Sequence, residues 1–209
     1  MTARRYHGCP RFTRHYVASK LRRDPVHLDV LAMAAQEPFG DVLDLGCGRG
    51  QLGVALLAAG LARSVLGVDR AGSSLADARR AAMGLPFAAM QADLAADPDL
   101  PACDTVLLVD VLHQLGAEPA LRLLRAAACA ARERVVVRTL DPAQGWRSRL
   151  SRVLERAGRT WWPHAGRRVE PLLVPTLLAA LRGEGFAASA VPCWRGTPFA
   201  SVLIAARRP

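Results

Sequence analysis

The stretch Val42-Leu-Asp-Leu-Gly-Cys-Gly-Arg-Gly-Gln-Leu-Gly53 decides the fold of this 209-residue chain. It begins with a short apolar run, which is typical of a buried strand. Glycines follow at alternating positions, and a helical pattern comes directly after them. Glycines between a strand and a helix allow a tight turn and a close approach of ligand to backbone, while the start of the helix offers unpaired N–H groups. The stretch therefore predicts a nucleotide-binding loop.

Strands and helices alternate around this loop. Short apolar runs predict strands at 41–45, 64–69, 87–93, 104–110, 133–140, 186–192 and 200–205. Helical patterns start at residue 25 and cover 51–59, 73–83, 119–131 and 174–181. Such alternation is typical of a parallel sheet with helices on both faces. We expect one doubly wound α/β domain at 41–209, preceded by a basic arm and a cap helix at 1–40. Residues 142–171 break the pattern and predict a basic, lid-like insertion.

Glycine spacing alone leaves two classes of nucleotide site open. The dinucleotide pattern G-x-G-x-x-G fits Gly48, Gly50 and Gly53, but that placement ignores Asp44 and Gly46. The complete stretch resembles motif I of class I S-adenosylmethionine-dependent methyltransferases, in which an acidic residue precedes three glycines. The resemblance covers roughly residues 41–140. It implies a Rossmann-like, mostly parallel sheet of seven strands whose last strand is antiparallel.

The resemblance also implies a binding site for S-adenosylmethionine. In this family, the acidic residue at the position of Asp69 binds both ribose hydroxyls, because a carboxylate accepts two O–H bonds; capping the next helix is the alternative role. Asp93 matches the acidic residue near the adenine amino group, with a solvated loop residue as the alternative. The expected cofactor-binding residues are Asp44, Gly46, Cys47, Gly48, Gly50, Asp69, Arg70, Asp93, Leu94 and Asp110.

The sequence also indicates roles for the side chains of Asp44 and Cys47. A carboxylate in an apolar strand is costly to bury without a partner. We therefore expect Asp44 to accept loop N–H groups or to face the methionine ammonium of the cofactor. Cys47 is interpreted as a small packing side chain rather than a reactive thiol. The five cysteines are scattered and include no CxxC pair, which favours a reducing cytoplasm and argues against a metal site.

The segment Asp110-Val-Leu-His113 bears on the methyl acceptor. Amino-group methyltransferases of nucleic acid or protein commonly carry Asn/Asp-Pro-Pro-Tyr/Phe at this point. The segment found here is similar to that of enzymes that methylate oxygen or carbon of small molecules and lipids. His113 titrates near neutrality and is the candidate general base; a structural or cofactor-packing role is the alternative. His15 and His164 are weaker candidates that we expect at the surface.

The net charge of +10 is confined to two segments. Residues 1–40 carry +4 and residues 142–168 carry +6, so the remainder is neutral. We expect both segments beside the acceptor, because ligands of this fold bind at the carboxyl ends of the strands. An anionic acceptor, an acidic carrier protein, an anionic membrane surface or, less readily, RNA would match this charge. A solvated arginine surface without a partner is the alternative.

Together these patterns predict a cytoplasmic methyltransferase of secondary metabolism. Its expected acceptor is oxygen or carbon of a small molecule, a lipid or a carrier-bound acyl group. The alternatives are an RNA methyltransferase and a cofactor-binding module without turnover. No apolar run approaches the roughly 20 residues that a membrane span needs, and no apolar segment follows the basic N-terminus as it would in a signal peptide.

Overall fold

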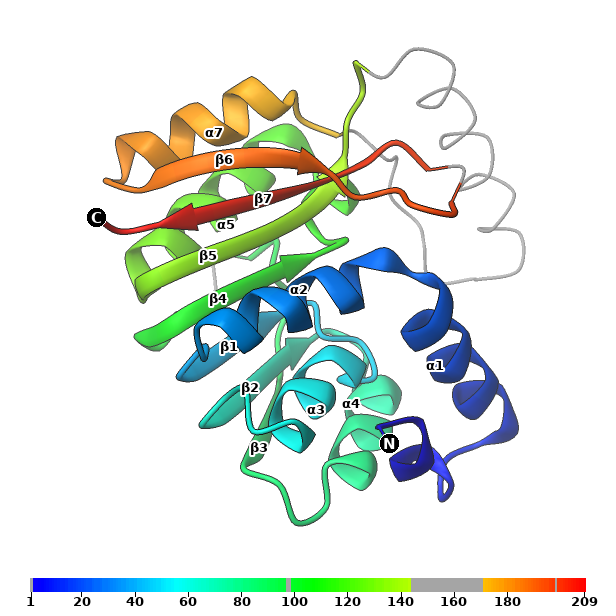
Figure 1. Cartoon of the computed structure of the whole chain (residues 1–209). Helices are drawn as coiled ribbons and strands as arrows, with labels where there is room; N and C mark the ends of the chain where they lie inside the picture. Colours follow the sequence, from blue (N-terminus) through cyan, green and yellow to red (C-terminus); the bar gives the residue numbers. More distant parts are fainter. Residues whose placement is uncertain (1, 97–98, 144–170, 198) are drawn as a thin grey trace.

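A seven-stranded sheet runs through the computed structural model, which describes residues 2–96, 99–143, 171–197 and 199–209 (Figure 1). The strand order is β3-β2-β1-β4-β5-β7-β6, and β7 runs antiparallel to both of its neighbours. This topology confirms the predicted doubly wound sheet with an antiparallel last strand. The strands are β1 (Asp41–Leu45), β2 (Ser64–Asp69), β3 (Phe87–Gln91), β4 (Cys103–Val109), β5 (Ala131–Leu140), β6 (Ala187–Pro192) and β7 (Ser201–Arg207).

Helices cover both faces of the sheet. Helices α2 (Pro25–Gln36) and α3 (Gln51–Ala58) pack on one face, and α5 (Ala117–Ala130) and α7 (Val174–Gly183) pack on the other. Side chains alternate between the faces along each strand, so Val136 of β5 packs with α2 and α3 while its neighbours Val135 and Val137 pack with α5 and α7. Covering both faces is the reason that the central strands read as continuous apolar runs.

Residues 2–23, expected from the sequence as a polar arm, form helical structure. Residues Thr2–Tyr6 form a 3₁₀ helix, η1, and residues Arg11–Arg23 form helix α1. Tyr6 is fully buried and packs against α3 and against α4 (Gly72–Ala81), which itself packs on β3. In Figure 1, α1 lies beside the helices that follow β1 and β2. The N-terminal segment is therefore part of the folded unit.

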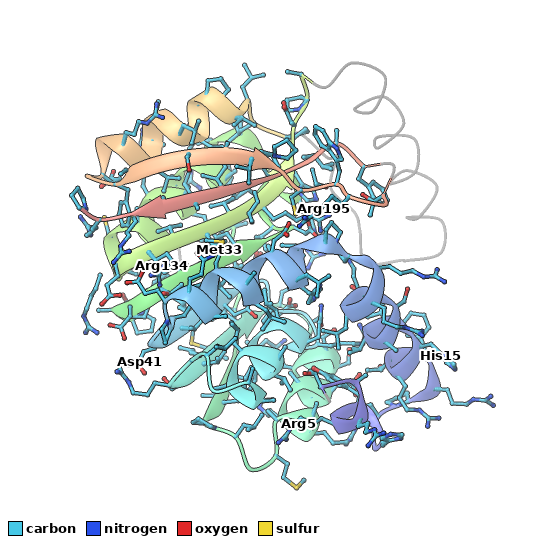
Figure 2. The ribbon with its side chains drawn as sticks, in the orientation of Figure 1. Arg5, His15, Met33, Asp41, Arg134 and Arg195 are labelled. Carbon is cyan, nitrogen blue, oxygen red and sulfur yellow. The ribbon has the colours of Figure 1, made fainter. Side chains whose placement is uncertain are left out.

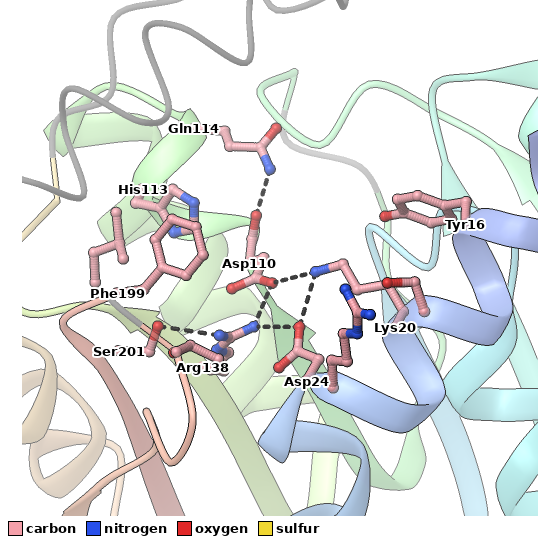
Figure 3. A pocket seen from close by; sticks show the side chains of 13 residues that line it. Tyr16, Lys20, Asp24, Asp110, His113, Gln114, Arg138, Phe199 and Ser201 are labelled. Carbon is pink, nitrogen blue, oxygen red and sulfur yellow. Dashed lines mark hydrogen bonds and ion pairs between the residues drawn. The ribbon is translucent and has the colours of Figure 1, made fainter.

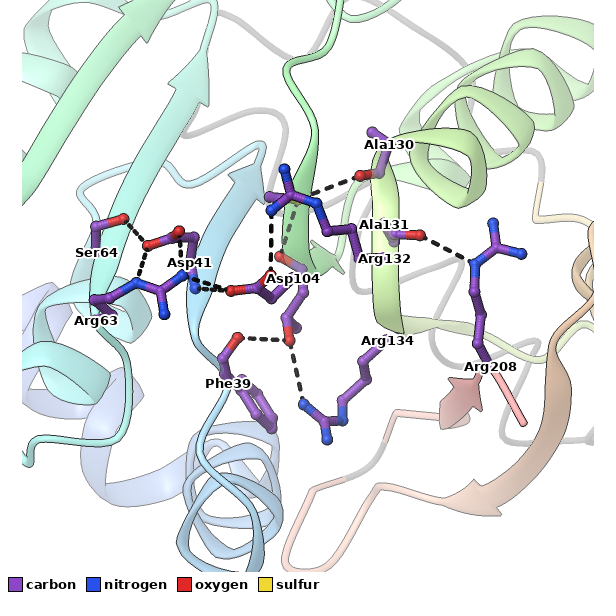
Figure 4. A network of polar contacts seen from close by, with 12 residues as sticks. Phe39, Asp41, Arg63, Ser64, Asp104, Ala130, Ala131, Arg132, Arg134 and Arg208 are labelled. Atoms are coloured by element: carbon purple, nitrogen blue, oxygen red, sulfur yellow. Dashed lines mark hydrogen bonds and ion pairs between the residues drawn. The ribbon is translucent and has the colours of Figure 1, made fainter.

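The amino ends of the strands are joined by a polar network (Figure 4). The Asp41 carboxylate of β1 accepts hydrogen bonds from Arg63 (2.9 Å) and Ser64 (2.7 Å) at the start of β2. These two hydrogen bonds lower the pKa of Asp41 to about 2. The Asp41 N–H donates to Asp104 of β4 (2.8 Å), and Arg132 of β5 lies 3.3 Å from the same carboxylate. The network lies at the edge opposite to the glycine loop, so it aligns the strands and takes no part in the site below.

Membrane spans, metal sites and the predicted insertion can be compared with the described residues. The proposed insertion at 142–171 falls almost entirely on residues 144–170, which lie outside the described residues. No described helix combines the length and apolar character needed to cross a membrane. Within the described ranges, no group of three or more His, Cys, Asp or Glu side chains could hold a metal ion.

Candidate functional site

The glycine loop after β1 bends against β2 and leaves one side open. The N–H groups of Gly46 and Cys47 both donate to the Val68 carbonyl, at 2.7 and 3.1 Å. Gly46 has φ +73°, and a Cβ there would lie 2.2 Å from Cγ2 of Val111, so a larger residue cannot occupy this position. Gly48 also has positive φ (+54°), but a Cβ there would meet no described atom within 4 Å. Gly48 therefore borders open space in which a ligand can approach the backbone.

Asp69 at the end of β2 faces this open glycine. Its Oδ2 accepts the Gly48 N–H at 2.8 Å, and its Oδ1 accepts the Ala71 N–H at 2.8 Å. The carboxylate thus links the glycine loop to the turn that precedes α4. It does not cap the helix, because the N-cap of α4 is Ala71 and no described side chain bonds to the first turn. The same contacts hold the carboxylate beside Gly48, where the expected ribose role requires it.

Asp44 is a buried carboxylate next to the loop, with only 3% of its surface exposed. Burial, together with repulsion from Asp69, raises the pKa of Asp44 to about 7. One expected role, acceptance of loop N–H groups, is wrong for Gly46, Cys47 and Gly48, because their N–H groups donate to Val68 and Asp69. A buried carboxylate with a raised pKa is stabilised when a cation comes beside it, which suits the other expected role.

The remaining predicted residues on this side follow β2 and β3. Asp69 pairs with Gln91 in the sheet, so Asp93 lies just beyond the same edge. Asp93 is exposed and accepts the Ala95 N–H at 3.0 Å, whereas Leu94 is buried. The Arg70 side chain is exposed, and its carbonyl accepts from the Gln91 amide.

Cys47 fills the space between the glycine loop and β2. Its Sγ would lie 2.8 Å from a Cβ added at Gly67, and the side chain is buried. Burial, with the nearby charges of Asp44 and Asp69, raises the pKa of the thiol above its usual range. A protonated, enclosed thiol agrees with the packing interpretation.

Arg49 connects the glycine loop to the N-terminal segment, a connection that the sequence reasoning missed. Its carbonyl accepts from the Tyr6 hydroxyl at 2.8 Å, and its Nε donates to the Thr13 hydroxyl at 3.0 Å. Nε also lies 3.4 Å from the Asp77 carboxylate of α4, which itself accepts from Thr13 at 2.7 Å. The guanidinium lies over the rings of Phe12 and Tyr16 of α1. Helices α1 and α4 therefore both hold this loop residue.

A pocket of about 480 Å³ opens beside the glycine loop, at the carboxyl ends of β4 and β5 (Figure 3). Asp110 and His113 line it after β4, Arg138 and Leu140 line it on β5, and α1 contributes Tyr16. Val111, which contacts Gly46, joins the pocket wall to the loop. The pocket therefore lies next to the expected cofactor site.

Four charged side chains form a network at the base of this pocket (Figure 3). Arg138 lies 3.0 Å from Asp24 and 2.7 Å from Asp110, while Lys20 lies 2.8 Å from Asp24 and 3.8 Å from Asp110. Burial would raise the pKa of Asp24, but the charges of Arg138 and Lys20 outweigh it and hold that pKa below its usual value. Ser201 accepts a further bond from Arg138 at 3.1 Å.

Asp110 is expected among the cofactor ligands, and the structure places its carboxylate in this network. Its φ of +61° is rare for a residue with a side chain and costs of order 1–3 kcal/mol. Backbone strain of this kind is commonly found at functional sites. Two contacts hold the conformation: the Asp110 N–H donates to the Arg138 carbonyl (3.0 Å), and the Gln114 amide donates to the Asp110 carbonyl.

His113 is buried in the short 3₁₀ helix η2 (Leu112–Gln114) and lies beside Phe199 in the pocket (Figure 3). Burial lowers the pKa of its imidazole, and the charges of Arg138 and Lys20 act in the same direction, whereas Asp110 opposes them. The imidazole is therefore neutral near pH 7, as a general base must be. His15 is exposed on α1 and points away from the fold (Figure 2), and His164 lies outside the described residues.

Comparisons with known proteins agree with this geometry. Residues 42–134 match the model of a family described as a methyltransferase domain. No curated protein matches the chain significantly.

Several solved structures have a similar fold. Magnesium protoporphyrin IX methyltransferase from Synechocystis PCC 6803, with bound SAH (S-adenosylhomocysteine), is 23% identical with a TM-score of 0.71 over 100% of this chain and 93% of that one. An O-methyltransferase family protein from Burkholderia thailandensis is 17% identical, with a TM-score of 0.70 over 98% and 61%. The N-methyltransferase NodS from Bradyrhizobium japonicum WM9 is 15% identical, with a TM-score of 0.65 over 91% of each chain.

Proposed function

Because residues 42–134 match the model of the methyltransferase-domain family and the chain has the Rossmann-like fold of class I S-adenosylmethionine-dependent methyltransferases, we propose that it methylates oxygen or carbon of a small molecule. The observation that supports this most directly is the arrangement of Gly48 and Asp69 beside a pocket of about 480 Å³ that contains His113. Residues 41–209 would form the catalytic domain, with residues 1–40 covering its acceptor side.

The residues around the glycine loop fit the cofactor. Gly48 borders space that no described side chain fills, and Asp44 offers a buried carboxylate with a raised pKa. We assign the ribose hydroxyls to Asp69, the methionine ammonium to Asp44 and the adenine amino group to Asp93. Gly46, Gly50 and Cys47 would shape the loop, while Arg70 and Leu94 would border the nucleoside. When bound, the cofactor supplies a methyl group on a strongly activated sulfonium.

The pocket residues supply positioning and one proton acceptor. Holding acceptor and donor in line, away from water, provides much of the rate enhancement for such a displacement. For a hydroxyl acceptor, neutral His113 would take the proton as the new bond to carbon forms. We place Asp110 in the wall between the cofactor and the acceptor, where Arg138 and Lys20 form ion pairs with its carboxylate.

The cysteines and the pocket volume bear on the location of the protein and on the size of its acceptor. The five cysteines are free thiols, four of them buried, which fits a reducing, cytoplasmic location. The pocket volume of about 480 Å³ fits a small molecule of secondary metabolism, or the end of a carrier-bound acyl group or lipid, better than a nucleic-acid strand.

Transfer of a labelled methyl group to separate pools tests the proposal. The pools are small-molecule extract, acyl carrier protein loaded with acyl groups, and total RNA. We expect label in the first or second pool. His113→Asn should lower kcat by about 10²–10⁴-fold while leaving SAH affinity unchanged. Label in RNA alone would instead support the RNA methyltransferase alternative, and SAH binding without any transfer would support a module without turnover.

A further inference from the structure

The charges that line the acceptor pocket do not cancel completely. Its charged lining residues are Lys20, Arg23, Asp24, Asp110 and Arg138. The two carboxylates are each paired with Lys20 and Arg138, at distances of 2.7–3.8 Å. Arg23 has no ion pair or hydrogen bond from its side chain to any described residue. Among the described residues, the pocket lining therefore carries one uncompensated positive charge, and that charge is on Arg23.

Arg23 lies at the far end of α1 from the glycine loop. It is the last residue of the helix and is exposed, while Tyr16 of the same helix contacts Arg49 of the loop. Arg23 comes seven positions after Tyr16 in the helix, which corresponds to about 10 Å along the axis. The Arg23 guanidinium consequently borders the acceptor part of the pocket rather than the cofactor loop.

An anionic group is the ligand that this position fits. A guanidinium offers a planar fork of N–H donors that binds a carboxylate or phosphate through two parallel hydrogen bonds. The pocket's own carboxylates do not compete for Arg23, because Asp24 and Asp110 already have two cationic partners each. A neutral or cationic acceptor would leave Arg23 without a counter-charge.

We infer that Arg23 is a specificity-determining residue that binds a carboxylate or phosphate of the acceptor, which restricts the substrates of this enzyme to anions. The inference rests on the proposed function, because it concerns the acceptor of the same site. It does not depend on which atom receives the methyl group.

The test separates a small-molecule extract by anion and cation exchange into acidic, neutral and basic pools before the enzyme and labelled S-adenosylmethionine are added. We expect label in the acidic pool. Arg23→Gln should raise the KM for this pool at least tenfold, and Arg23→Lys should recover part of the loss. Arg22→Gln is the matched control: Arg22 is its exposed neighbour on α1, donates to the Ala18 carbonyl and does not line the pocket, so it removes the same charge without effect on KM.

Calorimetry with SAH separates the cofactor from the acceptor as the source of the anion. The inference predicts equal SAH affinity in wild type, Arg23→Gln and Arg22→Gln. Weaker SAH binding by Arg23→Gln would overturn it, because Arg23 would then bind the methionine carboxylate. Labelling of the neutral or basic pool, or equal KM values for the two variants, would also overturn it while leaving the proposed function intact. Absence of label from every pool would refute the proposed function itself.

Discussion

At the scale of single residues, the proposed cofactor side of the site contains two carboxylates with different environments. Asp69 accepts two backbone N–H groups, from Gly48 and Ala71, whereas Asp44 is buried beside it with a pKa of about 7. In the free protein, the charged form of the Asp44 carboxylate is therefore unfavourable, and a bound cation would stabilise it. This arrangement makes Asp44 sensitive to both pH and ligand.

Cofactor affinity should depend on the ionisation of Asp44. The carboxylate must be charged to bind an ammonium group, and its pKa in the folded protein is about 7. SAH affinity should therefore fall as the pH is lowered from about 7 to about 5, by up to tenfold per pH unit once Asp44 is mostly protonated. Calorimetry across this range checks the effect. Asp44→Asn should bind weakly at every pH, and a wild-type affinity that does not change with pH would show that Asp44 does not meet the ammonium.

Asp69→Ala should weaken SAH binding by about ten- to a hundredfold. The substitution removes the acceptor for the ribose hydroxyls, and charged hydrogen bonds each contribute about 1.5–3 kcal/mol. It also releases the Gly48 N–H. Asp104→Ala at the opposite edge of the sheet is the control, because it removes a carboxylate that accepts a backbone N–H far from the loop. Equal SAH affinity in Asp69→Ala and wild type would mean that the ribose has another ligand.

At the scale of elements, the sequence predicted the strands well and the N-terminal helix poorly. Continuous apolar runs mark strands that are covered on both faces, and the glycine motif locates the loop that follows β1. Helix α1 buries only Thr13 and Val17, so its apolar periodicity is too weak to detect. The pocket network was also missed, because Asp24 and Arg138 are 114 residues apart and only the folded chain brings them together. The one sequence signal for this network was Arg138, because a charged residue in an otherwise apolar strand needs a partner.

Arg49 should couple α1 to the cofactor loop. Arg49→Ala removes its contacts with Thr13, Asp77 and the rings of α1 while leaving the glycines in place. We expect SAH affinity to fall by about three- to thirtyfold, as for the loss of one or two such contacts, and amide hydrogen exchange to accelerate in residues 11–23. Arg79→Ala provides a control on α4, since the Arg79 side chain bonds, among the described residues, only to the Ala89 carbonyl. Unchanged exchange in α1 would contradict the coupling.

At the scale of the whole molecule, the two edges of the sheet have different roles. The amino ends carry the ion-paired network of Asp41, Arg63, Asp104 and Arg132, which aligns the strands (Figure 4). The carboxyl ends carry the open glycine loop, Asp69 and the pocket. This division follows from the parallel strands, because the loops that follow parallel strands all lie at the same edge of the sheet. In such sheets, ligands bind where the strand order reverses, which is here between β1 and β4. The sequence therefore predicts the edge, and the basic segments already allow an anionic acceptor, while the position of Arg23 in the pocket is visible only in the folded chain.

The central claim is that the carboxyl edge binds S-adenosylmethionine. Isothermal calorimetry of the full chain with S-adenosylmethionine, SAH and NADH tests it most directly, because the glycine loop on its own also allows a dinucleotide. The account predicts saturable binding of S-adenosylmethionine and SAH with one site per chain, and no binding of NADH. Binding of NADH without S-adenosylmethionine or SAH would contradict it.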